Sequence, residues 1–390
     1  MTNSGSVQYH DLTIPDMSGK VLTVLGPIEP EQLGTTLMHE HMIFDFGVNR
    51  PDFFKPHFWS HTFQKPYPGD EQVELLLKNW DTRINLENGY KLMNYQDFNF
   101  FIRDEFWCRD DIDDAVEEML AFKSLGGKTV VDQTPTDLGR DPEKLREISV
   151  ATDMHVVMGT GSFLLAPNNP AGKPIDEITY AMVRDVAMGV GENKIRAGLL
   201  GEICGGVCEH DDTELTFLRA AARASRLTGA ALSIHTDSEQ NGNRHHSVLD
   251  VIEEEGGDLT RVIICHISAT ECEDLDFLEG LMRRGAILSF DHIGYPLTWH
   301  TKAYDQKEMA DGIIALIRRG YASQIIVGQD TAPKDTLRKY GGRGFTYIQE
   351  KLLPYMKSKG VSEAAITTLM VTNPQRILAL VPPQPLGGKG

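Results

Sequence analysis

The chain has 390 residues, 41% of them hydrophobic, which is enough for one large core or for two domains of ordinary size. Its formal net charge of −18 argues against a nucleic-acid partner and against binding to an anionic membrane surface. No window approaches the roughly 20 apolar residues that a membrane span needs. The start lacks the basic and apolar regions of a secretory signal, and the five cysteines lack a zinc-finger spacing, so we expect a cytoplasmic protein with reduced thiols.

The first apolar segments, residues 21–28 and then the run that ends at His41, predict a small hairpin that leads into the first main strand. His39 and His41 close that run. If it is a strand, their side chains point to the same side, because successive side chains alternate between faces. Two imidazoles aimed inward can share one metal ion. The alternative is a His-x-His sequence that arose by chance at a strand end.

Residues 45–110 form a long, aromatic-rich connection after this first strand. Connections of this length are usually functional, so we expect either a lid over a site or a covering subdomain that only packs. His57 and His61 lie in this connection as isolated histidines, and we expect them at the surface or in packing, not as metal ligands.

From residue 111 onwards, predicted helices and strands alternate. Short, nearly all-apolar strands are predicted at 128–132, 155–159, 196–202, 230–235, 261–266, 286–291 and 324–330, with a helix after each. Together with the strand at His39 this makes eight β/α units. The prediction is therefore an α/β fold, a (β/α)8 TIM barrel formed as one domain over residues 1–390, with an N-terminal hairpin and an insertion at 45–110.

Residues of the types that bind metal ions lie at the ends of five of the eight predicted strands. They are His39 and His41 on strand 1, Glu202 on strand 4, His235 on strand 5, His266 on strand 6 and Asp330 on strand 8. The carboxyl ends of barrel strands converge on one site, so we predict that these six side chains meet there.

The six residues can hold two divalent metal ions. His39, His41 and Asp330 would bind one ion, His235 and His266 the other, and Glu202 would bridge them. Imidazole ligands suit zinc, manganese, cobalt or iron better than calcium or magnesium. A two-metal site generates a bridging hydroxide and polarises a carbonyl or phosphoryl oxygen.

Several other residues have predicted roles near these strand ends. Asp330 would also deprotonate the attacking water, and His292, after strand 7, would accept that proton or would simply pack. Tyr295 and Trp299 would line a leaving-group pocket. Arg343, with Arg338 and Lys339, would hold an anionic substrate group or lie in a solvated glycine-rich turn. His245 and His246 open a helix, and we expect them to face solvent.

Nine segments resemble the phosphotriesterase family of the amidohydrolase superfamily, and most of all its phosphotriesterase-related branch. They are residues 23–28, 39–41, 198–202, His235, 265–267, 291–293, 328–330, 339–345 and 373–378. The resemblance covers nearly the whole chain. It implies a (β/α)8 barrel, a binuclear divalent metal centre, usually zinc, and hydrolysis of phosphotriesters, lactones, esters or amides.

Two positions depart from the phosphotriesterases themselves. Glu202 stands where they carry a carboxylated lysine, as in the related branch, and Ser268 and Ala269 stand where they place an acid after the strand-6 histidine. We therefore predict that a metal-bridging hydroxide attacks the carbonyl of a lactone, ester or amide in a small molecule. The alternatives are phosphotriester hydrolysis and a barrel that binds a ligand without chemistry. A homodimer is the default expectation.

Overall fold

The computed structural model describes residues 12–45, 108–163, 172–204, 212–236, 243–295, 305–332 and 334–386. Eight strands form one parallel sheet in the order β12-β11-β10-β9-β8-β7-β6-β3, so neighbours in space are also neighbours in sequence. The strands are β3 (Thr35–Glu40), β6 (Gly127–Asp132), β7 (His155–Ser162), β8 (Leu199–Cys204), β9 (Leu232–His235), β10 (Val262–Ile264), β11 (Ile287–Phe290) and β12 (Ile325–Val327).

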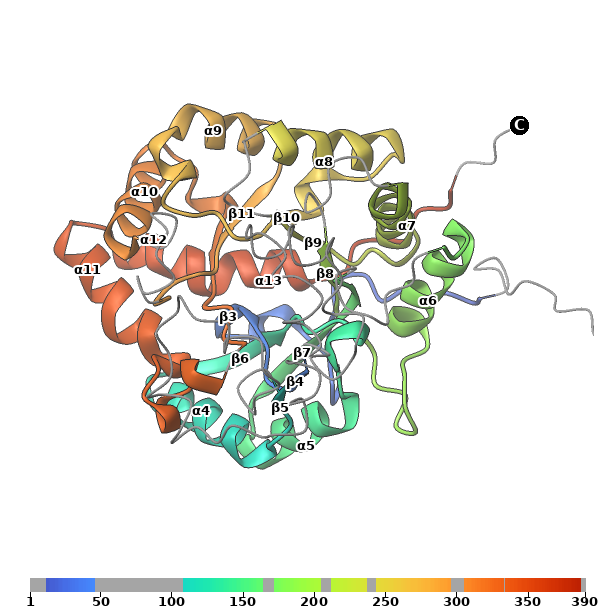
Figure 1. Cartoon of the computed structure of the whole chain (residues 1–390), viewed down its shortest axis with the longest axis horizontal. Coiled ribbons are helices and arrows are strands. Elements are labelled where there is room, and N and C mark those ends of the chain that lie inside the picture. The colour runs from blue at the N-terminus through green and yellow to red at the C-terminus, as the bar shows by residue number, and fades with distance from the viewer. Residues whose placement is uncertain are drawn as a thin grey trace, which may run out of the picture.

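Helices surround this sheet as a ring (Figure 1). They are α4 (Ile112–Ser124), α5 (Pro142–Thr152), α6 (Ile175–Ala187), α7 (Asp212–Thr228), α8 (Asn243–Glu254), α9 (Leu275–Arg283) and α10 (Gln306–Arg318). Short helices follow, α11 (Leu353–Ser358), α12 (Glu363–Thr367) and α13 (Asn373–Leu378), and α13 lies across the middle of the view in Figure 1. The predicted (β/α)8 barrel is confirmed. Within the described residues, no helix is long and apolar enough to span a membrane.

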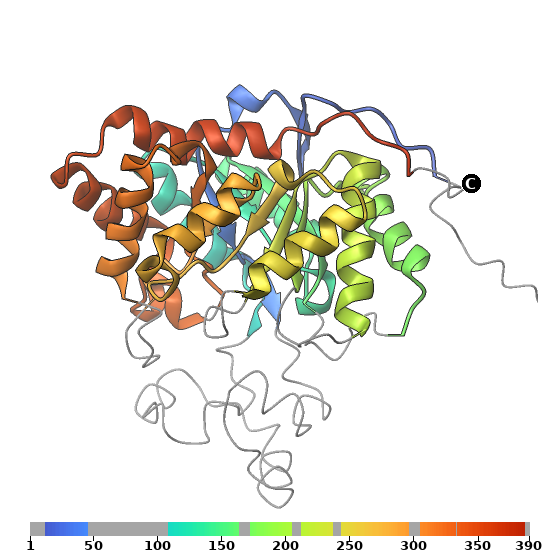
Figure 2. The same ribbon diagram turned by 90° about the horizontal axis from the view of Figure 1, so that it is seen from above.

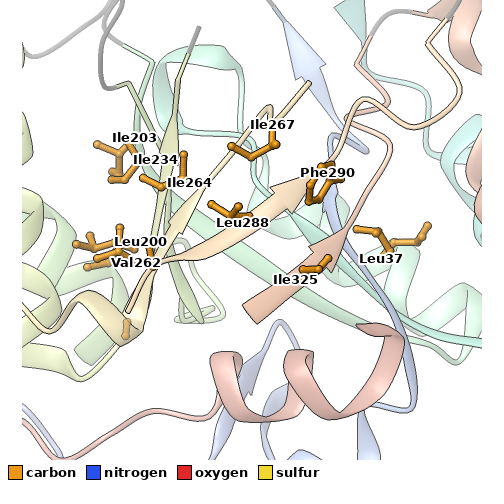
Figure 3. Packing of buried hydrophobic residues seen from close by; sticks show 14 of the residues in the cluster. Leu37, Leu200, Ile203, Ile234, Val262, Ile264, Ile267, Leu288, Phe290 and Ile325 are labelled. Atoms are coloured by element: carbon orange, nitrogen blue, oxygen red, sulfur yellow. The ribbon is translucent and has the colours of Figure 1, made fainter. Parts of the chain in front are cut away.

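Strand residues alternate between two apolar layers, as a period of two requires. One layer takes a residue from or beside every strand and fills the barrel: Met38, Val131, Val157, Leu199, Ala231, Ile263, Ile287 and Ile326. Their neighbours in sequence pack outward against the helices. Figure 3 labels members of this outer layer, including Leu200, Ile264 and Leu288. Strands buried on both faces explain the nearly all-apolar segments in the sequence.

The barrel closes where the end of β12 meets β3. The backbone N–H of Asp330 donates to the carbonyl of His39 at 2.9 Å. Gly328 allows this approach, because a Cβ at that position would lie 2.9 Å from both the backbone nitrogen and the Cβ of His39. The absence of a side chain at residue 328 therefore lets Asp330 lie beside the histidines predicted as ligands on strand 1.

The opposite end of the barrel is covered by the two ends of the described chain. The hairpin β1 (Val21–Thr23) and β2 (Gly26–Ile28) is antiparallel, as predicted. Val21 and Leu33 join the inner layer at this end, and so do Ile377 and Leu378 of α13. Figure 2 shows the hairpin in blue and the closing helices in red along the same end of the barrel.

The insertion predicted at 45–110 lies outside the described residues except at its two ends. Those ends form an antiparallel pair, β4 (Phe44–Asp45) with β5 (Cys108–Arg109). The ring of Phe44 lies 5.5 Å from that of His41, so the insertion leaves the barrel beside the predicted metal ligands. His57 and His61 also lie outside the described residues.

Candidate metal centre

Irregularities in the strands aim two of the six predicted ligands into the site. On β3, Leu37 pairs with Val130 of β6, and Glu40 pairs with Asp132. β3 therefore has one more residue than β6 between these two pairs, which is a β-bulge. The extra residue lets Met38 and His39 both turn inward. The same mismatch occurs on β8 between Leu200 and Ile203, around Glu202. Bulges of this kind re-aim side chains next to active sites.

The Glu202 carboxylate lies at the centre of the cluster. Its Oε1 is 2.6 Å from Nδ1 of His235 and 2.8 Å from Nε2 of His266. Nε2 of His39 lies 3.8 Å from Oε1, and Nε2 of His41 lies 3.8 Å from Oε2. One carboxylate therefore stands between the strand-1 histidines and the histidines of strands 5 and 6, as a bridging ligand would.

Asp330 completes the group on the strand-1 side. Its Oδ1 lies 3.0 Å from Nε2 of His41 and 3.8 Å from Nε2 of His39. Its Oδ2 lies 3.2 Å from Nε2 of His292, whose ring stacks on His266 with centroids 4.4 Å apart. One oxygen of Asp330 thus faces predicted metal ligands and the other faces the predicted proton acceptor.

Asp291 orients two of the imidazoles. Its Oδ2 accepts from Nδ1 of His39 at 2.8 Å, and its Oδ1 accepts from Nδ1 of His266 at 2.9 Å. A carboxylate can only accept, so both Nδ1 atoms carry hydrogen, and in the neutral imidazole each Nε2 would offer its lone pair to the cluster. Thr134 holds His41 in a similar way, with Oγ1 3.0 Å from Nδ1.

A buried nitrogen that lacks a hydrogen-bond partner indicates whether these residues fit a metal ion. Nε2 of His39 is buried and makes no hydrogen bond within the described residues. Asp291 keeps a hydrogen on Nδ1 of this ring, so Nε2 is the nitrogen that a proton or a metal ion can occupy. Nδ1 of His235 and Nε2 of His266 lie only 2.7 Å apart, which requires a proton or a cation between them. The donor set fits divalent metal ions held by nitrogen and oxygen.

Charge and burial shift the pKa values in this cluster. Burial favours the neutral form of His39, but Asp291, Glu202 and Asp330 outweigh it and raise its pKa to about 9. Burial likewise opposes the charge on Glu202, but His235 and His39 hold its pKa well below the usual range. Protons therefore compete with metal ions for these nitrogens. Burial, together with His266, lowers the pKa of His292, which leaves it neutral and able to accept a proton.

Two of the residues predicted to bind substrate, Tyr295 and Arg343, lie beside Asp330. The hydroxyl of Tyr295 donates to the backbone carbonyl of Asp330 at 2.6 Å, and the Arg343 guanidinium lies 4.1 Å from the centroid of the Tyr295 ring. Trp299 lies outside the described residues. Arg338 and Lys339 are exposed, and the Lys339 ammonium pairs with Asp114 of α4.

One expectation about the helices was wrong. α8 begins at Asn243 and includes His245, which is buried and packs its ring 5.6 Å from that of Phe277. His245 therefore does not face solvent. Lys128 could replace Glu202 as a bridge only if it reached the cluster, but it is exposed at the start of β6, at the far end of that strand.

Asp291, Thr134 and Glu40 are site residues that sequence reasoning missed. The two oxygens of Glu40 accept from the backbone N–H groups of Gln329 and Thr331, on either side of Asp330. Burial raises the pKa of Glu40 to about 7. Asp291 could have been found, because it is a carboxylate at the end of a predicted strand, immediately before His292. Ser268 holds another buried carboxylate, Glu271, through its backbone N–H at 3.0 Å.

The chain resembles known proteins over nearly its whole length. A sequence model of the phosphotriesterase family matches residues 19–378. An N-acetyltaurine hydrolase from Tetraodon nigroviridis is 28% identical over 371 residues, which cover 93% of this chain and 99% of that protein. A phosphotriesterase-related protein from Nematostella vectensis is 29% identical over 368 residues, which cover 92% of this chain and 98% of that protein.

Solved structures share the barrel. The crystal structure of a resiniferatoxin-binding protein from Rhodobacter sphaeroides has a TM-score of 0.78 and 32% identity, with 96% of this chain and 98% of that chain covered. A lactonase from Listeria monocytogenes has a TM-score of 0.70 at 24% identity, with 93% and 99% covered, and this likeness supports the fold alone. With the family model matching most of its length and the cluster assembled at the strand ends, the chain belongs to the phosphotriesterase family and is a hydrolytic enzyme.

Proposed function

We propose that this protein is a binuclear metal-dependent hydrolase that cleaves an amide, ester or lactone bond in a small molecule. The observation that carries the proposal is the position of Glu202, whose carboxylate lies between two pairs of imidazoles. The Nε2 atoms of His39 and His266, the two rings that Asp291 orients, both face it. His39, His41 and Asp330 would hold one ion, His235 and His266 the other, and Glu202 would bridge them. Zinc is the proposed metal.

The residues around the ions have separate tasks. When bound, two divalent ions acidify a water molecule and polarise the oxygen of the bond to be cleaved. Asp330 orients the attacking water and takes up its proton. Nε2 of His292 lies 3.2 Å from Oδ2 of Asp330, so the proton can pass to His292 and away from the site.

Relatives support a carboxylic substrate over a phosphotriester. Several proteins named N-acetyltaurine hydrolase, from Tetraodon nigroviridis to Rattus norvegicus, are 27–29% identical to this chain over nearly its full length. N-acetyltaurine is an N-acyl amino sulfonate, so an amide of this class is the first substrate to test. Phosphotriester hydrolysis remains the alternative reaction.

A second candidate is a barrel that binds a ligand without turning it over. The relative from Rhodobacter sphaeroides, at 32% identity, is named for binding resiniferatoxin. The 3.2 Å contact between Asp330 and His292 favours chemistry, because binding alone would not need a proton acceptor beside a metal ligand.

The test uses protein stripped with a chelator and then reloaded with zinc or manganese. It is assayed against N-acetyltaurine, a γ-lactone, 4-nitrophenyl acetate and paraoxon, and its metal content is measured. We expect about two divalent ions per chain and turnover of a carboxylic substrate that chelation abolishes. Active protein without stoichiometric metal would contradict the proposal. Paraoxon as the best substrate would favour the phosphotriester reaction, and saturable binding without product would favour the binding protein.

Two further expectations are part of this proposal. The insertion at 45–110 acts as a lid, because its ends pair beside His41. The protein works in the cytoplasm on a small molecule, as a homodimer, without a nucleic-acid or membrane partner.

A further inference from the structure

Asp330 has an unusual backbone for a residue with a side chain. Its φ is 46°, in the left-handed region that residues other than glycine rarely adopt. Both of its backbone polar groups are held: the N–H donates to the carbonyl of His39 at 2.9 Å, and the carbonyl accepts from the Tyr295 hydroxyl at 2.6 Å. A strained conformation persists only where its surroundings determine it, so these two contacts keep Asp330 in place.

Tyr295 also reaches the carboxylate of Asp330. Its hydroxyl lies 3.3 Å from Oδ2, the oxygen that faces His292, whereas Oδ1 faces His41. The phenol therefore lies on the proton-accepting side of the carboxylate and leaves the metal-facing side clear. Only 4% of Tyr295 is exposed, which leaves little of its surface for contact with a substrate.

Arg343 packs on the face of the Tyr295 ring and restricts its position. Its guanidinium lies over the ring face, 4.1 Å from the centroid, and Nη2 donates to the carbonyl of Gln329, the residue before Asp330. Gly294 makes room for this arrangement, because a Cβ there would lie 2.4 Å from Cδ of Arg343. A cation over an aromatic face is attractive, and a guanidinium suits it better than an ammonium because it is planar.

We propose that Tyr295, braced by Arg343, is a positioning residue that holds Asp330 in its left-handed conformation and orients its carboxylate between the metal ligands and His292. The proposal deepens the proposed function, because it rests on Asp330 being a metal ligand and a proton acceptor. It assigns Tyr295 and Arg343 an effect exerted through Asp330 and not through direct contact with the substrate.

The two roles differ in which kinetic constant they change. A residue that positions Asp330 alters kcat and the affinity of the metal site that includes Asp330, and it leaves KM nearly constant. A residue that lines the substrate pocket raises KM and leaves metal affinity constant.

Tyr295→Phe is the first test, because it keeps the ring under Arg343 and removes only the hydroxyl. We expect kcat to fall about 10-fold with KM within about 2-fold, as for the loss of one hydrogen bond that holds the backbone of a reacting residue. We also expect one of the two zinc sites to weaken about 10-fold in competition with a chromogenic chelator. Tyr340→Phe is the matched control, since it removes a hydroxyl that donates to Asp114 at 2.7 Å, and it should change neither quantity. Thermal unfolding confirms that both variants fold.

Arg343→Lys is the second test, assayed with N-acetyltaurine and with a neutral γ-lactone. We expect kcat to fall for both substrates, by less than in Tyr295→Phe. A rise in KM for N-acetyltaurine alone would overturn the proposal and make Arg343 a direct ligand of the sulfonate. Unchanged kcat and zinc affinity in Tyr295→Phe would also overturn it. Zinc titration needs no substrate, so a wild-type protein without turnover would count against the proposed function and leave the positioning test intact.

Discussion

Nδ1 of His39 and the carboxylate of Asp291 lie 2.8 Å apart, although 252 positions separate the two residues in the sequence. The other oxygen of the same carboxylate accepts from Nδ1 of His266 at 2.9 Å. His39 and His266 would serve different metal ions. Asp291 would therefore orient one ligand of each ion, and a change at this single residue should affect both sites.

Asp291→Asn tests this shared role. The amide keeps the size of the carboxylate, but it has one acceptor oxygen, and its NH2 group would face the second Nδ1–H. We expect both zinc sites to lose about 10- to 100-fold in affinity, the usual cost of losing the hydrogen-bond partner of a ligating histidine. Zinc titration against a chromogenic chelator measures this. Thr134→Val, which removes only the partner of His41, should weaken one site. Two sites of wild-type affinity in Asp291→Asn would refute the shared role.

Glu202 allows a prediction about assembly. A lysine can bridge two cations only after carbon dioxide converts its amine to a carbamate, whereas Glu202 already carries a carboxylate. Stripped protein should therefore regain activity with metal alone, at the same rate with or without bicarbonate. Glu202→Gln should lose activity on the order of 100-fold, because a neutral amide bridges cations poorly. Bicarbonate-dependent recovery would mean that another residue is the bridge.

The insertion after β3 should affect catalysis more than metal binding. Its ends pair as β4 and β5 beside His41, at the rim of the site. A lid that excludes water strengthens the interactions around the reacting groups. Deleting residues 51–59 should lower kcat/KM for the best substrate about 10-fold or more and leave the zinc content near that of the full chain. Unaltered kinetics would reduce the insertion to a structural cover.

His245 should make stability depend on pH. Burial and the neighbouring His246 lower its pKa from 6.5 to about 4. Between these values the unfolded chain binds a proton at this residue and the folded chain does not. The stability that comes from keeping His245 neutral in the folded protein is therefore fully present above pH 6.5. As pH falls towards 4, it is lost, and the free energy of unfolding drops by up to about 3 kcal/mol.

Urea unfolding of the wild type and of His245→Gln at several pH values isolates this effect. Gln cannot titrate, so the wild type should lose its stability advantage over the variant as pH drops from 6.5 to 4. Other acidic groups change both proteins equally and cancel in the difference. A constant difference across this pH range would show that His245 protonates as easily in the folded protein as in the unfolded chain.

The strand limits show where sequence reasoning failed. The strands predicted at 261–266 and 324–330 run to their ligands, but β10 ends at Ile264 and β12 ends at Val327. His266 and Asp330 have φ values of 62° and 46°, which no strand accommodates. An apolar run that continues into a ligand looks like one strand, because nothing in the pattern of hydrophobicity marks a change in backbone conformation.

The eight strands and the six candidate ligands could be predicted because each depends on a local regularity. Apolar runs mark strands that are covered on both faces. The carboxyl ends of parallel barrel strands lie at the same end of the barrel, whatever the length and sequence of the loops. The contacts of Asp291 with His39 and His266, of Tyr295 with Asp330, and of His245 with Phe277 have no such regularity. They join residues that are distant in the chain, and bulges and left-handed residues set their geometry. Those features arise from the packing of one strand against the next, which the order of residues along a single strand does not specify.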